Sequence, residues 1–229
     1  MIEEPPILKI RRNFPRPTAS QIDALRDTST SFAVDAMDGH GALDYRIKPL
    51  DPNCSHFIGT AITCHAGPSD NMAVKAAIDL SRAGDVIVVC AEQFTGAAST
   101  GDLLVGIMKN RGVVGFVTDG LVRDFDDIVP IGLPVFAMGL TPNSGVCTGP
   151  GTVGLPVIVG GVPVDSGDVV LGNRDGVTIV PRSQLDIVGK RLVRIREMEA
   201  DLESQVRAGL TETPGTRKLF ESGRVEYLD

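Results

Sequence analysis

The sequence predicts an α/β protein. Segments with helical spacing of apolar residues alternate along the chain with short runs of β-branched, apolar residues. One of these runs, residues 86–90, is apolar without interruption, which is typical of a central strand buried on both faces. The chain has 229 residues, of which 42% are hydrophobic, so it can bury a real core and could form one domain.

The totals exclude some classes of protein. The 29 acidic residues outnumber the 22 basic ones, so the formal net charge is −7 and the concentrated basic face of a nucleic-acid-binding protein is not expected. The four cysteines form no CxxC pair and no metal-ligand spacing, which favours reduced thiols. The acidic start lacks the apolar core of a signal peptide, and no run reaches transmembrane length. We therefore expect a cytoplasmic protein that binds neither nucleic acid nor membranes.

The chain divides into three expected regions. Residues 1–17 are rich in proline and carry a small basic patch, so we expect an extended N-terminal arm that can lie on a neighbouring subunit. Residues 18–181 form the expected core. Residues 182–229 are expected to form a C-terminal helix and tail that pack on the core or on a neighbouring subunit.

Local patterns predict the elements of the core in order. A helix capped by Thr18 or Ser20 begins the core, and a turn at Gly160-Gly161 joins two short strands as a hairpin. The other expected helices lie at residues 31–37, 71–82 and 182–207, and the expected strands lie within 45–64 and at 86–90, 113–117, 134–138, 157–159, 162–164, 169–171 and 177–180.

The most informative stretch is GDLLVGIMKNRGVVGFVTDGLVRDFDD, residues 101–127. It predicts a helix that begins near Asp102, a strand, a turn, and then Arg123 and Asp124. If the strand runs antiparallel to the helix, Asp102 faces the two later residues. Helix amides and an arginine fork suit a carboxylate or phosphate, and an aspartate beside them suits magnesium or manganese. The alternative is a helix-capping Asp102 and a solvated Arg123-Asp124 pair.

The spacing of Asp102, twenty further residues and then Arg123-Asp124 resembles that of the class II pyruvate aldolases. These are the 4-hydroxy-4-methyl-2-oxoglutarate / 4-carboxy-4-hydroxy-2-oxoadipate aldolases, and the family includes the regulator of ribonuclease E activity A. The resemblance runs from about residue 29 to residue 181. It implies a compact α/β/α-type sandwich with a central β-layer, assembled as trimers or dimers of trimers with active sites at subunit clefts.

The resemblance also implies roles for individual residues. Arg123 would grip the carboxylate and carbonyl of a pyruvyl group, and Asp124 would hold a divalent cation, Mg²⁺ or Mn²⁺. Asp102 would orient a metal-bound water that moves protons. Separately, the long C-terminal helix suggests that its Glu199 could reach the metal-bound waters of a neighbouring subunit. The backbone amides that complete the anion site would be those of Gly101, Asp102, Leu103 and Leu104.

The implied reaction is retro-aldol cleavage of a 4-hydroxy-2-oxoacid to pyruvate plus a second oxoacid, with oxaloacetate decarboxylation as a side activity. Cation and arginine stabilise the enolate charge, so no lysine Schiff base is needed. One alternative is a non-catalytic regulator that binds a ribonuclease. Another is an enzyme of the same type that acts on a sugar-acid derivative. The sequence does not identify the residues that contact the distal half of the substrate.

Two weaker signals are set aside. A GxGxxG pattern at residues 149–154 precedes a strand-like run, whereas a dinucleotide-binding fingerprint requires a helix there. His40, His56 and His65 show no HxH or HxxxH spacing, so we interpret them as ordinary polar residues and not as zinc ligands.

Overall fold

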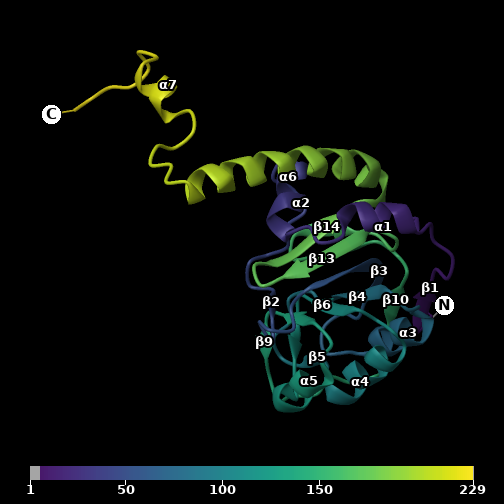
Figure 1. The fold of residues 1–229 in the computed structure, drawn as a ribbon. Helices are drawn as coiled ribbons and strands as arrows, with labels where there is room; N and C mark the ends of the chain where they lie inside the picture. The colour runs from purple at the N-terminus through teal and green to yellow at the C-terminus, as the bar shows by residue number, and fades with distance from the viewer. Residues whose placement is uncertain (1–5, 229) are drawn as a thin grey trace. The chain divides into compact units, whose positions relative to one another are not determined.

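A mixed β-sheet forms the centre of the protein in the computed structural model, which describes residues 6–228 (Figure 1). Within those residues the sheet has nine strands. Seven follow one another across it in the order β1 (Leu8–Ile10), β10 (Gly151–Val153), β3 (Phe57–His65), β4 (Asp85–Cys90), β6 (Gly115–Thr118), β8 (Val135–Ala137) and β2 (Lys48–Pro49). The other two, β13 (Val169–Asn173) and β14 (Gly176–Val180), form a hairpin that pairs with β3.

The predicted central strand, residues 86–90, lies in the parallel centre of the sheet. Strand β4 pairs in parallel with β3 on one side and with β6 on the other, and all six of its residues are buried. Strand β8 continues the parallel set beside β6. Because β4 and β6 are parallel, the chain between them has to cross over, and the helix of the residue 101–127 stretch makes that crossing.

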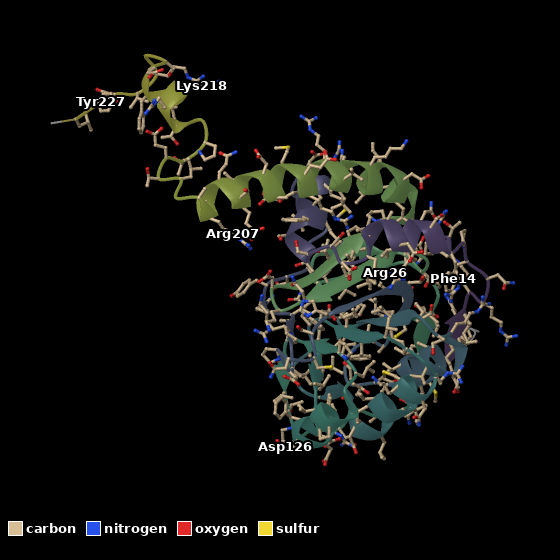
Figure 2. The ribbon with its side chains drawn as sticks, viewed as in Figure 1. Phe14, Arg26, Asp126, Arg207, Lys218 and Tyr227 are labelled. Carbon is tan, nitrogen blue, oxygen red and sulfur yellow. The ribbon has the colours of Figure 1, made fainter. Side chains whose placement is uncertain are left out.

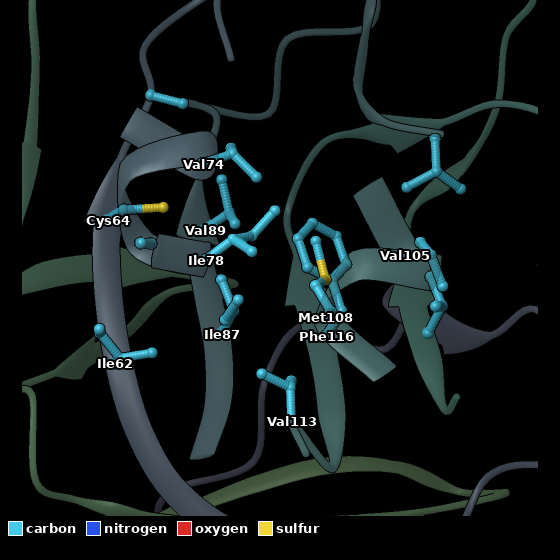
Figure 3. Packing of buried hydrophobic residues seen from close by; sticks show 14 of the residues in the cluster. Ile62, Cys64, Val74, Ile78, Ile87, Val89, Val105, Met108, Val113 and Phe116 are labelled. Atoms are coloured by element: carbon cyan, nitrogen blue, oxygen red, sulfur yellow. The ribbon is translucent and has the colours of Figure 1, made fainter. Parts of the chain in front are cut away.

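Helices cover one face of the sheet. These are α3 (Met72–Leu80), α4 (Asp102–Asn110) and α5 (Phe125–Ile131). They enclose a core in which Phe116 of β6 and Met108 of α4 are fully buried, beside Ile87 of β4 (Figure 3). Burying each such side chain stabilises the fold by about 1.5–3 kcal/mol before entropy is counted. This packing fixes where the first turn of α4 lies.

The other face is covered mainly by strands. The hairpin of β11 (Val157–Val159) and β12 (Val162–Val164) packs there with Phe136 and Val88 in a second core. The predicted turn at Gly160-Gly161 is confirmed, since both glycines have positive φ. A smaller sheet of β5 (Ala98–Thr100), β7 (Leu121–Val122) and β9 (Gly139–Leu140) lies beyond the ends of β4 and β6 in the chain. The α/β fold class is therefore confirmed.

Capping residues define the first two helices. Thr18 accepts a hydrogen bond from the amide of Gln21, whose side chain bonds back to the Thr18 amide, and this capping box starts α1 (Ala19–Leu25). The side chain of Ser29 caps α2 (Thr30–Ala36) by accepting one hydrogen bond from the Phe32 amide. The predicted cap at Thr18 is confirmed.

The C-terminal region begins with a short 3₁₀ turn, η1 (Arg182–Gln184), and the long helix α6 (Leu185–Arg207). Leu185, Val188 and Leu192 are buried and belong to the unit formed by the preceding chain. Residues 193–228 form a second unit with the rest of α6 and the short α7 (Thr216–Phe220). Asp229 lies outside the described residues.

The described part of the N-terminal arm packs on the core of its own chain, and its expected contact with a neighbouring subunit stays a prediction. Leu8–Ile10 pair in parallel with β10 of the same chain. Arg16 then donates to both oxygens of Asp85, at 2.5 and 2.9 Å, and stacks 4.9 Å from the ring of Phe14, which Figure 2 labels. Asp85 is fully buried, so this ion pair fastens residues 6–17 to the core. Residues 1–5 of the predicted arm lie outside the described residues.

Three further expectations can be compared with the structure. The GxGxxG segment contains strand β10 and leads to β11 and not to a helix, as expected. All four cysteines are free thiols, and Cys64 and Cys90 are buried. Across residues 6–228, none of the helices combines the length and apolar character needed to cross a membrane.

Candidate active site

A cavity of about 310 Å³ lies at the first turn of α4. Ala98 and Thr100 of β5 line it, and so does Arg123, which follows β7. A second part of its wall comes from the start of α3 and from the loop after β9. The cavity-lining residues of α4 and the preceding position are Gly101, Asp102, Leu103 and Leu104, and those of the second part are Asn71, Lys75, Ser144, Gly145 and Cys147.

The helix start and Arg123 meet at this cavity, as the sequence predicted. Gly101 is the N-cap of α4, and Asp102 lies in the first turn. The Arg123 amide donates to the carbonyl of Thr100 at 3.1 Å, so the residue before the N-cap also positions the arginine. Half-buried Arg123 donates from Nε to Oδ2 of Asp124 at 3.1 Å. Free amides of a helix start and a guanidinium together favour a bound anion.

Asp124 stands behind Arg123 and is not itself among the cavity-lining residues. It is the N-cap of α5, with its backbone in the left-handed region at φ 62°, and its carbonyl accepts from the amides of Asp127 and Ile128. Such a backbone costs about 1–2 kcal/mol outside glycine, and aspartate tolerates it better than most residues. This geometry turns the Asp124 carboxylate, which is 32% exposed, toward Arg123 and Gly101.

Gly101 is required by a close approach. A Cβ at this position would lie 2.3 Å from Oδ2 of Asp124 and 3.1 Å from Nε of Arg123. The φ of Gly101 is −142°, which any residue adopts, so its backbone conformation makes no demand for glycine. The missing side chain therefore leaves room for the Arg123-Asp124 pair against the helix start.

Sequence reasoning did not find the second part of the cavity wall. Asp70 accepts hydrogen bonds from the amides of Met72 at 2.7 Å, Thr148 at 2.7 Å and Gly149 at 2.8 Å. Burial raises the pKa of the Asp70 carboxyl, but these backbone donors outweigh burial and hold that pKa below its ordinary value. The carboxylate thereby fastens residues 144–149 to the start of α3.

Two cavity-lining residues at the start of α3 have unusual surroundings. The Nζ atom of Lys75 lies 3.2 Å from the Sγ atom of Cys147. Asn71 does not cap α3 with its side chain, and its buried Oδ1 atom has no hydrogen-bond partner among the described residues. A buried acceptor left in this state costs about 1–3 kcal/mol. A cavity lined by two cations is suited to an anionic ligand, and the Asn71 oxygen is suited to a ligand hydroxyl that donates to it.

Comparison with known proteins places the chain in a family. The sequence pattern of RraA-like proteins, described as Aldolase/RraA, matches residues 27–179. The chain belongs to the aldolase/RraA family. The resemblance expected from the Asp102, Arg123 and Asp124 spacing is therefore confirmed at the level of the family.

Named members of the aldolase/RraA family carry two kinds of description. A protein of Halalkalibacterium halodurans named "Putative 4-hydroxy-4-methyl-2-oxoglutarate aldolase" is 36% identical over 187 residues, which cover 82% of this chain and 87% of that protein. The Streptomyces coelicolor protein RraAS2, a member of the RNase ES inhibitor RraA family, has a TM-score of 0.73 at 26% identity, covering 84% of this chain and all of that one. The RNA-processing inhibitor RraA of the genus Thermus has a TM-score of 0.62 at 26% identity, covering 68% and 93%.

The donor atoms at this site fit one class of metal ion. Within residues 6–228, no three histidine, cysteine, aspartate or glutamate side chains gather closely enough to form a metal cage. A transition-metal cage of the zinc type is thus not supported by the described residues. Mg²⁺ and similar hard cations instead keep several waters and need only one or two carboxylates. The Asp124 carboxylate, which is 32% exposed, is a donor of that kind.

Proposed function

We propose that this protein is a divalent-metal-dependent aldolase that cleaves a 4-hydroxy-2-oxoacid to pyruvate and a second oxoacid. The observation that carries the proposal is the convergence at Gly101. There the start of α4, the Arg123 guanidinium and the Asp124 carboxylate come together at the edge of one cavity. The aldolase-named relative, which aligns with most of the chain, supports the same class of reaction.

The proposed reaction breaks the bond between C3 and C4 of the substrate. The C4 hydroxyl loses its proton and becomes the carbonyl of the second oxoacid. The electron pair of the broken bond moves into the pyruvyl half, which leaves as the enolate of pyruvate. A proton added at C3 then completes pyruvate. The barrier is the negative charge of the enolate, so the residues that stabilise that charge contribute most to the rate.

Arg123 and the start of α4 bind the pyruvyl half in this proposal. The guanidinium offers a planar fork to the carboxylate and to the developing enolate oxygen. The amides of residues 101–104 face the same anion, assisted by the positive end of the helix dipole. Asp102 lines the cavity beside them and is proposed to hold and move the proton.

Asp124 is proposed to hold a Mg²⁺ or Mn²⁺ ion with the help of waters. When bound, such an ion supplies positive charge that stabilises an enolate. Arg123 donates only to Oδ2 of Asp124, so the other carboxylate oxygen is not engaged in that contact. The left-handed backbone of Asp124 keeps the carboxylate next to the anion-binding amides, where the cation is needed.

The second candidate is a regulator that binds a ribonuclease without catalysis. The structures of RNA-processing inhibitors among the relatives favour it. A regulator that acts by surface contact has no need for the close approach of Gly101 to Asp124, so we prefer the aldolase. Release of pyruvate from oxaloacetate with Mg²⁺, faster than in the same solution without protein, separates the two candidates, because only an enzyme adds to the protein-free rate.

The decisive experiment measures pyruvate release from oxaloacetate and from 4-hydroxy-4-methyl-2-oxoglutarate by the purified protein. We expect a chelator to abolish turnover and Mg²⁺ or Mn²⁺ to restore it. Asp124→Asn should lose activity, whereas Asp126→Asn, at an exposed carboxylate of the same helix turn, should keep it. Full activity in excess chelator would end the metal-dependent proposal, and pyruvate release no faster than in the protein-free solution for any substrate would favour the regulator.

We also propose that the active form is a homotrimer or a hexamer. Leu103 and Ile107 of α4 are 76% and 45% exposed beside the cavity, and an interface would bury them. In this assembly Glu199 of α6 contributes to the metal site of a neighbouring subunit. Sedimentation combined with activity measurements tests the assembly, and a fully active monomer would contradict it.

A further inference from the structure

The cavity carries two cations, and they belong to different segments of the chain. Arg123 follows β7 and contacts Asp124, whereas Lys75 lies on α3 and contacts Cys147. The proposed aldolase reaction uses Arg123 for the pyruvyl half of the substrate. It assigns no role to Lys75, although that side chain lines the same cavity.

Lys75 has no anionic partner in the described part of the chain. The ion pairs of residues 6–228 do not include it, and its nearest polar contact is the sulfur of Cys147 at 3.2 Å. An ammonium group has three donors, and a thiol is a weak acceptor for one of them. Asn71 lies four positions earlier, and so on the same side of the helix start, with a buried Oδ1 atom that also has no partner. A ligand carboxylate would accept from the Lys75 ammonium, and a ligand hydroxyl would donate to the Asn71 oxygen.

The position of Lys75 is fixed from two sides. Helix α3 packs into the core through Ala73 and Val74, which are fully buried. Cys147 lies on the loop whose backbone amides donate to Asp70, so the loop that carries the sulfur is held against the start of α3 by those hydrogen bonds. Lys75 is exposed, and its ammonium stands at the wall of the cavity, where a ligand can reach it.

We propose that Lys75 binds a second carboxylate of the substrate, at the end of the molecule away from the pyruvyl group. The substrate class is then the dicarboxylic 4-hydroxy-2-oxoacids and not neutral sugar-acid derivatives. This assignment rests on the proposed aldolase function, because it takes Arg123 as the partner of the first carboxylate. The cavity of about 310 Å³ has the volume of roughly ten liquid waters, which is enough for such a small acid.

The test compares two inert ligands that differ only at the distal end. 2-Oxoglutarate and 2-oxopentanoate have the same chain length, but only the first carries a carboxylate at the fifth carbon. Calorimetry with Mg²⁺ present should show that the wild-type protein binds 2-oxoglutarate tighter by about tenfold to hundredfold, as for one charged hydrogen bond. Lys75→Met should lose this preference while binding 2-oxopentanoate normally, which also shows that the variant is folded.

Two further variants complete the design. Lys75→Arg should retain most of the preference, because a cation remains. Lys109→Met removes a lysine that instead bonds to the carbonyl of Gly132, outside this cavity, and should leave the preference unchanged. Equal binding of the two ligands by the wild-type protein would overturn the proposal, and so would an undiminished preference in Lys75→Met.

The outcome is separable from that of the proposed function. If the wild-type protein releases no pyruvate but still prefers 2-oxoglutarate in a Lys75-dependent way, the aldolase proposal fails and the distal carboxylate site stands. If it releases pyruvate in a metal-dependent reaction but shows no such preference, the reverse holds. Failure of both ligands to bind the wild-type protein overturns the distal site as well.

Discussion

Replacing Gly101 by alanine should damage the site much more than the fold. The new methyl carbon would lie 2.3 Å from Oδ2 of Asp124, whereas ordinary van der Waals contact begins at 3.4 Å. The carboxylate, or the helix start itself, must therefore move by about 1 Å. The same carbon would also lie 3.2 Å from Cγ of Arg123, so the arginine is pushed as well. Both groups proposed to bind metal and substrate are displaced by one methyl group.

The expected magnitudes differ for activity and for stability. A displacement of about 1 Å at reacting groups can cost about 100-fold in rate, which corresponds to about 2.7 kcal/mol of transition-state stabilisation. The clashing Oδ2 atom is the end of a flexible side chain that is 32% exposed, so it can move at little cost. Alanine at the N-cap stabilises the helix less than glycine does, and this difference is small. The free energy of unfolding should therefore fall by no more than about 1 kcal/mol.

Gly106 provides a matched control within the same helix. A Cβ there would meet only Cδ1 of Ile131, at 4.0 Å, which is an ordinary contact. Gly106→Ala should keep full activity and raise the free energy of unfolding by about 0.5–1 kcal/mol, because alanine favours the helix interior. Pyruvate release and urea unfolding are measured for both variants. Wild-type kinetics in Gly101→Ala would refute the role given to the close approach. A fall of several kcal/mol in the free energy of unfolding of Gly101→Ala would show that Gly101 serves the fold and not the site.

Three further outcomes are expected. Arg123→Lys should lower kcat/KM at least about tenfold to hundredfold, because a point charge does not replace a planar fork; unchanged steady-state kinetics would contradict its role. Asp102→Asn should stall turnover yet bind oxalate, a mimic of the pyruvate enolate, with near-normal affinity in calorimetry with Mg²⁺; loss of both would make Asp102 a metal or structural residue. Arg16→Met should lower the free energy of unfolding in urea by about 3–5 kcal/mol, because it leaves buried Asp85 without its partner. Arg11→Met removes an exposed pair and should lower it by less than about 1 kcal/mol; equal losses in the two variants would refute the role of the buried pair.

Much of the fold could be predicted because its signals are local. The continuous apolar run of β4, the cap at Thr18 and the double-glycine turn of the β11–β12 hairpin each lie within a few residues of what they specify. Helix α5 was not predicted. It contains Pro130, and the side chain of its N-cap, Asp124, makes no capping hydrogen bond, so the usual signals of a helix are weak there. The pairing of β1 with β10 joins residues far apart in the sequence and has no local signal.

The same distinction applies to the candidate site. Asp102, Arg123 and Asp124 belong to one crossover of the chain, so their proximity follows from a helix and the strand after it. Lys75 and Asn71 join the cavity only because residues 144–149 are fastened to α3 by hydrogen bonds that span more than 70 residues. Asp70 looks like an ordinary loop carboxylate in the sequence, and no nearby residue indicates which amides donate to it. The distal half of the cavity was therefore not predictable.

The Asp70 clamp makes one side of the cavity open to redesign. In this clamp the donors to the Asp70 carboxylate are mostly main-chain amides, which every residue except proline provides. The loop is therefore held in place largely independently of its side chains. Ser144 and Cys147 project from this loop at the cavity wall and can in principle be exchanged while the backbone stays in place. A library of substitutions at these two positions would vary the shape and charge that this wall offers to a ligand. Gly101, Arg123 and the other residues of the opposite wall would stay unchanged.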